Sequence, residues 1–444
     1  MASAVPACLP TGPGRNWRAG LAGQAAALAA VMLLAACGGA SGVHKEPDEA
    51  GGHRMVIGVS RELPGGDVPV GQAVRGLTAF GHELYTVVAD PAKNTVISPL
   101  SIGIAFGMAR AGAGGQTASQ LDQVFGFPPR LHAAFNDLDR KIVTGGPPPP
   151  RLPPNTTRKP GEPPAPPVVA IANGLFVQDG FAVKGDFLRI LASQYGAGAE
   201  LADFTSGRAA DQINTWVRAA TAERITKVFD QLDPGTRLVL ANAVYLKADW
   251  QSPFSASTMS EPFTRLDGTV TAVPMMNQQA EFRYASGRGW QAVELPYARS
   301  ELAMRVIVPQ GAGGLAGLLS PATLSEIQAG LRPQRVDLFL PQWDFATDVN
   351  LLPALRKLGL NAVNGFPGIS DAALELAAAV HRANITVDEW GTEAAAVTGL
   401  AMIVSAPAQP PVVVRADHPF AFEIVHRPTG APLFIGHVAD PLAR

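Results

Sequence analysis

The chain has 444 residues, of which 47% are hydrophobic and 16% charged, and its formal net charge is −2. This composition provides ample material for a core, and the near-neutral charge gives no electrostatic basis for binding nucleic acid or a polybasic contact with a membrane. The length allows one large domain or two to three smaller ones.

Residues 1–36 have the pattern of an export signal. Arg15 and Arg18 give a positive start, and residues 19–36 carry no charge and are rich in Ala and Leu. The stretch is short for a membrane-spanning helix and is followed by Cys37 in a Leu-Ala-Ala-Cys motif that resembles a bacterial lipobox. We expect cleavage before Cys37 and acylation of its thiol; the alternative is an uncleaved membrane anchor.

The cysteine content agrees with export as a lipoprotein. Cys8 lies in the predicted signal and Cys37 would carry the lipid, and the sequence has no further cysteine. The mature domain would then have neither a disulfide nor a free thiol. A lipid on Cys37 would anchor the protein, since each lipid methylene buried in the membrane contributes about 0.8 kcal/mol to binding. We therefore expect an exported protein that is anchored to the outer face of the cell membrane, or else secreted.

The next segment, residues 37–69, is rich in Gly, Pro and charges, which predicts a flexible tether in which residues 55–59 could form a short strand. Apolar residues at helical spacing, and a proline at a permitted first helical position, predict the elements that follow. The expected helices are residues 72–88, a helix from Ser98-Pro99, and residues 119–125 and 131–143.

Residues 145–167 contain a run of prolines and favour a polyproline II insertion loop, with a partner-docking motif as the alternative. Beyond it the pattern alternates between strands and a few helices. We expect strands at 168–177, 237–247, 290–308 (two strands) and 336–341, and helices at 211–228 and 352–358. Short helices followed by many strands indicate an α+β architecture.

An uncharged segment follows residues 388–396, which read Asp-Glu-Trp-Gly-Thr-Glu-Ala-Ala-Ala. Gly391 offers a permissive backbone. In an extended strand, alternate residues from Thr392 to Met402 share one face and are small or apolar, whereas Glu393 falls on the other face. The segment is therefore suited to an exposed loop or to a strand buried in a sheet.

The flanking sequences resemble the serpin family. Residues 381–396, which begin His-Arg-Ala-Asn-Ile-Thr-Val, are similar to the serpin strand that leads into the reactive-loop hinge. Further similar motifs are 94–102 (the early helix), 242–254 (the central strand), and 417–422 and 432–438 (the C-terminal strands). They keep serpin order and cover about Val70 to Pro441.

The resemblance implies one serpin domain over residues 70–444. Its fold is expected to be α+β, with about eight or nine helices packed on three mainly antiparallel or mixed β-sheets and an exposed reactive-centre loop at 391–411. The loop hinge is expected to comprise Glu389, Gly391, Thr392, Glu393, Ala394, Ala395 and Ala396. Trp390 and Gly399 depart from the usual family pattern, and neither blocks insertion of the loop.

The resemblance also implies a buried hydrogen-bond cluster, the shutter, beneath the main sheet. Its expected members are Ser98, Ser101, Asn242 and His381, and Trp250 is expected near the point where the loop first enters. Without the resemblance, each of these residues would be interpreted as a cap, a turn or a plain core residue.

In inhibitory serpins the residue presented to the protease lies fourteen residues after the hinge glycine. Counting from Gly391 gives the reactive bond Ser405–Ala406, and a shift of one or two residues would present Val404 or Ile403. All these residues are small or aliphatic, so elastase-like or subtilisin-like serine proteases are the expected targets.

The implied function is suicide trapping of a serine protease: an acyl-enzyme forms at the reactive bond and the loop then inserts into the main sheet. The chain would not be an enzyme, and we expect a monomer with no metal, no cofactor and no nucleic-acid partner. In particular we expect no heparin-type cofactor, since residues 131–143 are not strongly basic. The alternatives are a non-inhibitory serpin-fold binding or chaperone-like lipoprotein, a solute-binding lipoprotein, and a hydrolase, for which no nucleophile-elbow or zinc motif is found.

Overall fold

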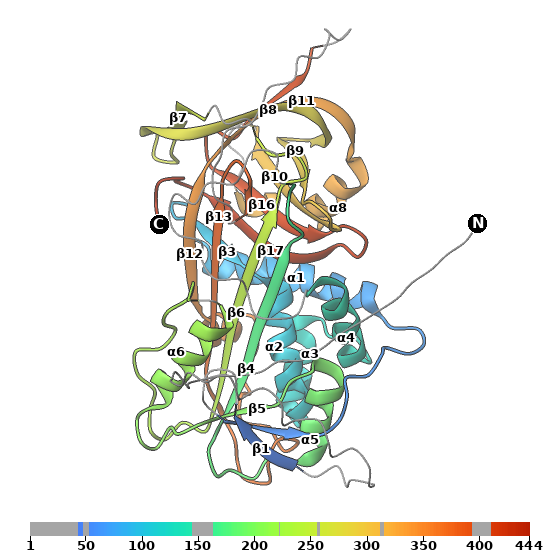
Figure 1. Cartoon of the computed structure of the whole chain (residues 1–444), viewed down its shortest axis with the longest axis vertical. Coiled ribbons are helices and arrows are strands. Elements are labelled where there is room, and N and C mark those ends of the chain that lie inside the picture. Colours follow the sequence, from blue (N-terminus) through green and yellow to red (C-terminus); the bar gives the residue numbers. More distant parts are fainter. Residues whose placement is uncertain are drawn as a thin grey trace, which may run out of the picture. The chain divides into compact units, whose positions relative to one another are not determined.

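The structure is a computed structural model that describes residues 43–47, 53–143, 163–221, 223–254, 258–310, 315–392 and 410–444 (Figure 1). Several expected features lie outside these ranges: the signal with Cys37, most of the proline-rich loop, the hinge residues Glu393 to Ala396, and the bond between Ser405 and Ala406. Helices and strands in the described ranges give the expected α+β class.

The main sheet has eight strands in the described part of the chain. Their order is β1 (Val43–Pro47), β2 (His53–Ile57), β5 (Ala199–Ala202), β4 (Val168–Gln178), β6 (Leu238–Asp249), β14 (Gly391–Thr392), β13 (Leu376–Val387) and β12 (Trp343–Asn350). The central strand β6 is buried almost throughout because both of its faces are covered.

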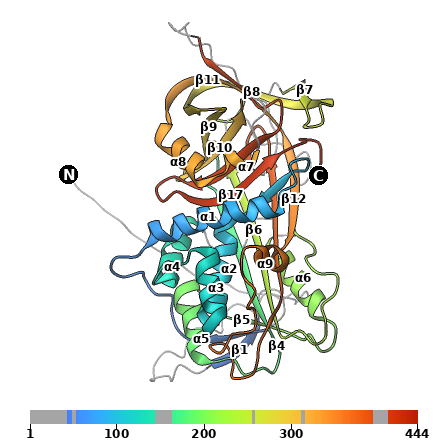
Figure 2. The same cartoon turned by 180° about the vertical axis from the view of Figure 1, so that it is seen from behind.

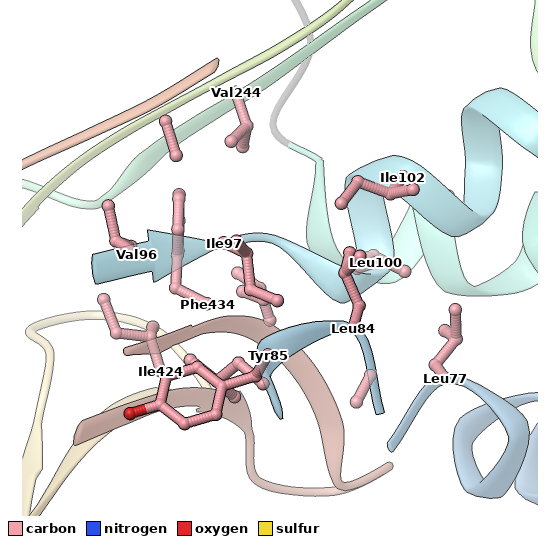
Figure 3. Packing of buried hydrophobic residues seen from close by; sticks show 14 of the residues in the cluster. Leu77, Leu84, Tyr85, Val96, Ile97, Leu100, Ile102, Val244, Ile424 and Phe434 are labelled. Atoms are coloured by element: carbon pink, nitrogen blue, oxygen red, sulfur yellow. The ribbon is translucent and has the colours of Figure 1, made fainter. Parts of the chain in front are cut away.

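Helices cover both faces of the main sheet. Leu240 and Val244 of β6 belong to the large core on the side of α2 (Pro99–Gly112), whereas Val239 and Ala241 pack under α6 (Ala209–Ala220) on the other side (Figures 1 and 2). Alternate residues of a strand point to opposite faces, which explains this division. Figure 3 shows the large core, where side chains of α1, α2 and β3 pack together below β6.

The second sheet has nine strands among the described residues. Its members are β15 (Val412–Arg415), β11 (Arg332–Pro341), β8 (Val270–Gly287), β9 (Trp290–Pro296), β10 (Leu302–Pro309), β16 (Phe420–His426), β17 (Ala431–Val438), β3 (Thr95–Ile97) and β7 (Met259–Thr264). The long strand β8 joins two parts of this sheet: it pairs with β7 and β11 along most of its length and with β9 at its end. Where the sequence analysis expected three sheets, the described strands form two, because β8 joins both parts of the second sheet.

Four of the remaining helices lie where the sequence predicts them: α1 (Val70–Val88), α3 (Gly115–Phe125), which begins earlier than predicted, α4 (Leu131–Ile142) and α9 (Leu351–Lys357). The sequence analysis did not predict the others, which are α5 (Gly185–Ile190) with the π-helical turn η1 (Leu191–Tyr195), α7 (Leu315–Leu318) and α8 (Pro321–Gly330). No helix within the described ranges has the length and apolar character needed to cross a membrane.

Helix α6 is shorter than the predicted 211–228. It ends at Ala220, and the chain turns back so that Asn214 accepts hydrogen bonds from the backbone amides of Val228 (2.8 Å) and Phe229 (3.1 Å). Ile225 is buried as its helical spacing predicted, but it is reached through a turn. Periodicity indicated the buried face correctly and the helix end incorrectly.

The sequence analysis predicted a flexible tether over residues 37–69, but the described residues of this segment form strands and contact other elements. Strand β2 pairs with β5, and Arg61 binds Asn136 (2.9 Å) and Asp139 (2.6 Å) on α4. The backbone amide of Glu62 also donates to Ser193 O at 2.8 Å. Composition alone predicted a flexible chain because these partners lie far away in the sequence.

One end of the main sheet is parted by a short strand. Strands β6 and β13 pair directly in parallel from Leu238 and Leu376 to Val244 and Ala383. Beyond that point β14 lies between them, antiparallel to both: Thr392 pairs with Ala248 on one side and with Val387 on the other. We call the direct contact between β6 and β13 the seam.

Candidate functional site

Three polar residues lie in one row across the centre of the main sheet. Asn242 of β6 is paired with Asn173 of β4 on one side and with His381 of β13 on the other, and Asn242 and His381 are nearly inaccessible to solvent. Nδ1 of His381 donates to Oδ1 of Asn242 at 2.5 Å. This hydrogen bond crosses the seam.

The start of α2 completes this cluster from below. Pro99 begins the helix, and the Ser98 side chain caps it by accepting a hydrogen bond from the Ser101 amide at 3.2 Å. The Ser98 amide donates to Nε2 of His381 at 3.1 Å, and Nδ2 of Asn242 donates to Oγ of Ser101 at 2.5 Å. The structure therefore brings Ser98, Ser101, Asn242 and His381 together.

The hydrogen bonds determine the state of the histidine. Nδ1 must carry a proton to donate to Asn242, and Nε2 must be free of one to accept from Ser98. Burial lowers the pKa of His381 to about 3, in agreement with a neutral ring. Parting the seam would leave buried polar groups without partners unless new ones are supplied.

Asn173 is a further member of this cluster that the sequence interpretation missed. Its Oδ1 accepts a hydrogen bond from Nδ2 of Asn242, so both amide protons of Asn242 are engaged and its Oδ1 is directed at His381. A polar residue inside the apolar run 168–177 is the signal that could have identified it, because a buried amide requires partners.

A second cluster surrounds the point where β14 enters the sheet. The ring of Trp250 stacks on Tyr297 with centroids 4.7 Å apart, and its Nε1 donates to Asp388 O at 3.0 Å. The hydroxyls of Tyr297 and Thr392 lie 2.7 Å apart, and Thr392 is buried. Trp250 thus lies beside the start of β14, and a hydroxyl pair holds the Thr392 side chain.

The turn before β14 is fixed by its own hydrogen bonds. Oδ1 of Asp388 accepts from the amides of Trp390 (2.8 Å) and Gly391 (3.2 Å). Glu389 is buried, accepts a hydrogen bond from Thr258, and offers its carbonyl to the Phe254 amide at 2.8 Å. This segment is firmly packed in the structure.

Glycine is required at position 391 because the backbones of β14 and β6 lie very close together there. A Cβ at this position would lie 2.1 Å from Ala248 O and 2.7 Å from Asp249 Cα, both backbone atoms of β6. The sequence interpretation assigned this glycine to conformational freedom, whereas the backbone contact with β6 explains it better.

The sequence model of the family described as serpin (serine protease inhibitor) matches residues 75–441. The chain belongs to the serpin family. An uncharacterized serpin-like protein of Thermococcus kodakarensis is 35% identical over 379 residues, covering 83% of this chain and 85% of the relative. The leukocyte elastase inhibitor of Bos taurus is 30% identical over 390 residues, covering 82% and 98%.

Solved serpin structures share the fold. Native protease nexin-1, solved with heparin, superposes with a TM-score of 0.71 and 26% identity, covering 84% of this chain and 100% of that one. Of the expected site residues, Ser98, Ser101, Asn242, Trp250, His381, Glu389, Gly391 and Thr392 lie in the described ranges.

Proposed function

We propose that this serpin inhibits serine proteases by suicide trapping, as an exported monomer. The observation that carries the proposal is β14. Gly391 and Thr392, where the expected loop begins, already form a strand between β6 and β13. In the proposal, the rest of the loop follows the same path once a protease has cut it.

The pairing of β14 supports a specific register for that path. Thr392 is opposite Ala248, and each further residue would move one step back along β6, so that Thr398 comes opposite Asn242. The pairing of Thr392 with Val387 leads independently to Thr398 opposite His381. The inserted strand would thus pass between Asn242 and His381.

The residues of the loop suit this insertion. Thr398 would share the buried face of Thr392, because their positions differ by an even number. Its hydroxyl can both donate and accept a hydrogen bond, so it can serve groups released when the bond between Asn242 and His381 breaks. Ala394, Ala396, Leu400 and Met402 would add small or apolar side chains to the same face.

The chemistry would be supplied by the target protease. Its serine hydroxyl attacks the Ser405 carbonyl, its histidine takes the hydroxyl proton and passes it to the leaving amine of Ala406, and an ester joins protease and inhibitor. Insertion then drags the ester-linked protease along the sheet and distorts its active site, so that water cannot complete the reaction.

The free energy would come from the new strand. About ten added backbone hydrogen bonds at roughly 1 kcal/mol each give a driving force on the order of 10 kcal/mol. The uncleaved fold would then be held by a kinetic barrier rather than by equilibrium stability.

The loop and the N-terminal sequence support the choice of target and location. Ile403, Val404 and Ser405 are small or aliphatic, so they suit elastase-like or subtilisin-like pockets. The relative from Bos taurus is named as an inhibitor of leukocyte elastase. The proposed lipid on Cys37 would hold the inhibitor at the outer face of the cell membrane.

The test is incubation of the mature chain with pancreatic elastase or subtilisin, followed by a denaturing gel. We expect a covalent adduct that survives boiling in detergent. Thr392→Arg should turn the inhibitor into a substrate, because it places a charge at the buried start of the inserted strand. Thr86→Arg, at an exposed position on α1, is the control. Cleavage by both proteases without any adduct would refute trapping.

A further inference from the structure

Four charged side chains form a row across the second sheet. Arg283 of β8 is paired with Glu294 of β9. Arg305 of β10 is paired with Glu294 on one side and with Glu423 of β16 on the other. The signs of the charges therefore alternate across four neighbouring strands, which lie in the upper half of the view in Figure 1. We call these four residues the charge row.

Three members of the charge row are buried and bonded to one another. The side chains of Glu294, Arg305 and Glu423 are each 3% exposed, whereas that of Arg283 is 48% exposed. Nε of Arg305 lies 3.0 Å from Oε2 of Glu294, and its Nη1 lies 3.0 Å from Oε2 of Glu423. Its Nη2 donates to Gln328 of α8, and Nε of Arg283 lies 3.6 Å from Glu294. Every charge in the row thus has an opposite charge beside it.

The strands around the charge row are apolar on both faces. Every residue of β10, β16 and β17 is buried. The only Asp, Glu, Lys or Arg residues in β9, β10 and β16 are Glu294, Arg305 and Glu423. A strand that alternates between apolar and polar residues specifies its register, because a slip by one residue moves its apolar side chains to the solvent face. In these uniformly apolar strands the pattern does not distinguish one register from another.

The charge row distinguishes the observed register of β16 from the neighbouring ones. A slip of β16 by one residue along β10 would turn Glu423 to the opposite face of the sheet. A slip by two residues would keep the face but place Arg305 opposite Ala421 or Val425 in place of Glu423. Either slip would leave buried charges without their partners, which is far more costly than an exchange of one apolar contact for another.

The register of β16 also determines how much chain remains for the loop. Residues 416–419 join β15 to β16 and are held at both ends. The Ala416 amide donates to a carbonyl oxygen of β11 at 2.9 Å, and Nε2 of His418 donates to the last carbonyl oxygen of β10 at 3.0 Å. With so short a connection, a slip of two residues in β16 would pull β15 with it. About 7 Å of chain would then pass between the sheet and the loop that ends at Val412.

We propose that the charge row locks the register of β16, and that through β16 it sets the length of the loop presented to a protease. The first part stands on the strand pairings, and the second rests on the proposed function. Pairing of β16 with β10 requires a long loop to close, because Arg305 and Glu423 are 118 residues apart in the sequence. Apolar groups of similar volume often replace a buried ion cluster without loss of stability, and fixing a register is its best attested use.

The test locates β16 with disulfides in a full chain whose two natural cysteines are replaced by alanine. Met304→Cys with Ile424→Cys reports the observed register, since these two residues are paired. Met304→Cys with His426→Cys reports a slip of two residues, because diagonal neighbours lie about 7–8 Å apart and are not bridged without movement of the backbone. Each chain is refolded from urea under reducing conditions and then oxidised briefly, and the disulfide is measured by mass spectrometry.

The charge row is removed by Glu294→Leu, Arg305→Met and Glu423→Leu together. We expect this charge-free variant to form the slipped disulfide at least about fivefold more than the chain with an intact row, because nothing else in these strands specifies the register. Without added cysteines, its ratio of elastase adduct to cleaved inhibitor should fall at least about twofold, since part of the chains would present a loop of the wrong length. Arg305→Lys, which keeps the charge, should preserve the observed register. The control is Arg110→Met with Asp122→Leu, which removes an ion pair of 2.7 Å between α2 and α3 and should change neither readout.

The outcomes separate the two parts of the inference. An unchanged disulfide pattern in the charge-free variant would overturn the register lock. A charge-free variant without a cooperative unfolding transition in urea would overturn it too, because the row would then serve stability. Slipped strands with an unchanged adduct ratio would overturn the link to the loop. A wild-type chain that elastase cleaves without forming any adduct would refute the proposed function and leave the disulfide result standing.

Discussion

The imidazole of His381 donates from Nδ1 to Oδ1 of Asn242 across 2.5 Å, and this hydrogen bond joins β13 to β6 at the seam that the loop would enter. The neutral ring is needed, because Nε2 accepts the Ser98 amide proton at 3.1 Å. A proton added to Nε2 would face another donor. Acid would therefore act directly on a group whose hydrogen bond crosses the seam.

We predict that the native fold loses stability as the pH falls below about 6.5. An unfolded histidine has a pKa near 6.5, whereas burial lowers the pKa of His381 to about 3 in the fold. Between these values the unfolded chain binds a proton that the native chain does not, so stability falls with pH, by up to about 1.4 kcal/mol per unit for one histidine. Urea midpoints at about pH 7.5 and 5.0 measure it.

His381→Gln should weaken this dependence without abolishing it, because burial also lowers the pKa values of His132 and His437. His418 is the matched control: its hydrogen bond to Asp417 raises its pKa, so its contribution is present at low pH and lost as the pH rises. His418→Gln should therefore steepen the loss in acid. An unchanged slope in His381→Gln would contradict this account.

Asn242→Ala should destabilise the closed sheet. The change leaves Nδ1 of His381 and Oγ of Ser101 buried without their present partners, at about 1–3 kcal/mol for each unsatisfied group. We expect a lower urea midpoint and more high-molecular-weight species on native gels after mild heating. Asn384→Ala, on the partly exposed face of β13, should change both much less. Equal behaviour of the two variants would argue against a special role for the row.

Gly391→Ala should displace the start of the loop from the sheet. Its Cβ would lie 2.1 Å from Ala248 O, so β14 must move away from β6, at about 1–3 kcal/mol for overpacking. Limited proteolysis should then cut near Thr392 faster than in the wild type. Gly185→Ala is the control, because its Cβ would meet only Val43 at 3.7 Å. If Gly391→Ala is as resistant as Gly185→Ala, the close approach is not what selects glycine.

Ser405→Arg should bring trypsin-like proteases into range. Their pocket carboxylate would gain a charge-assisted partner, while the inhibitor's own fold should change little because the substitution lies near the cut end of the loop. Titration with trypsin and mass spectrometry of the released fragment provide the test. A wild-type fragment that begins at Ala406 supports the count from Gly391, and one that begins elsewhere shifts the register.

The sequence identified much of the architecture because most elements have local signals. The 3.6-residue spacing in α1 and the proline at the first position of α2 were sufficient to predict both helices. The end of α6 was not predictable in this way, since the chain turns back so that the backbone amides of Val228 and Phe229 donate to Asn214, although the apolar pattern continues.

Long-range pairing explains what the sequence interpretation missed. The sequence analysis interpreted the segment of β1 and β2 as a tether because β5, the strand that pairs with β2, lies more than 140 residues away in the sequence. The role of Asn173 is visible only in the fold, where β4 lies beside β6 and the Asn173 side chain accepts a hydrogen bond from Asn242. Ser98, Ser101, Asn242 and His381 were chosen by family resemblance, because nothing in their local sequence indicates that they meet.

The most direct test of the account is the structure of the chain after elastase has cut the loop. The account predicts one continuous strand from Gly391 to about residue 402 between β6 and β13, with Thr398 in the row of Asn242 and His381. The hydrogen bond between Asn242 and His381 should then be gone. A cleaved chain in which β6 and β13 remain directly paired from Leu238 to Val244 would contradict it.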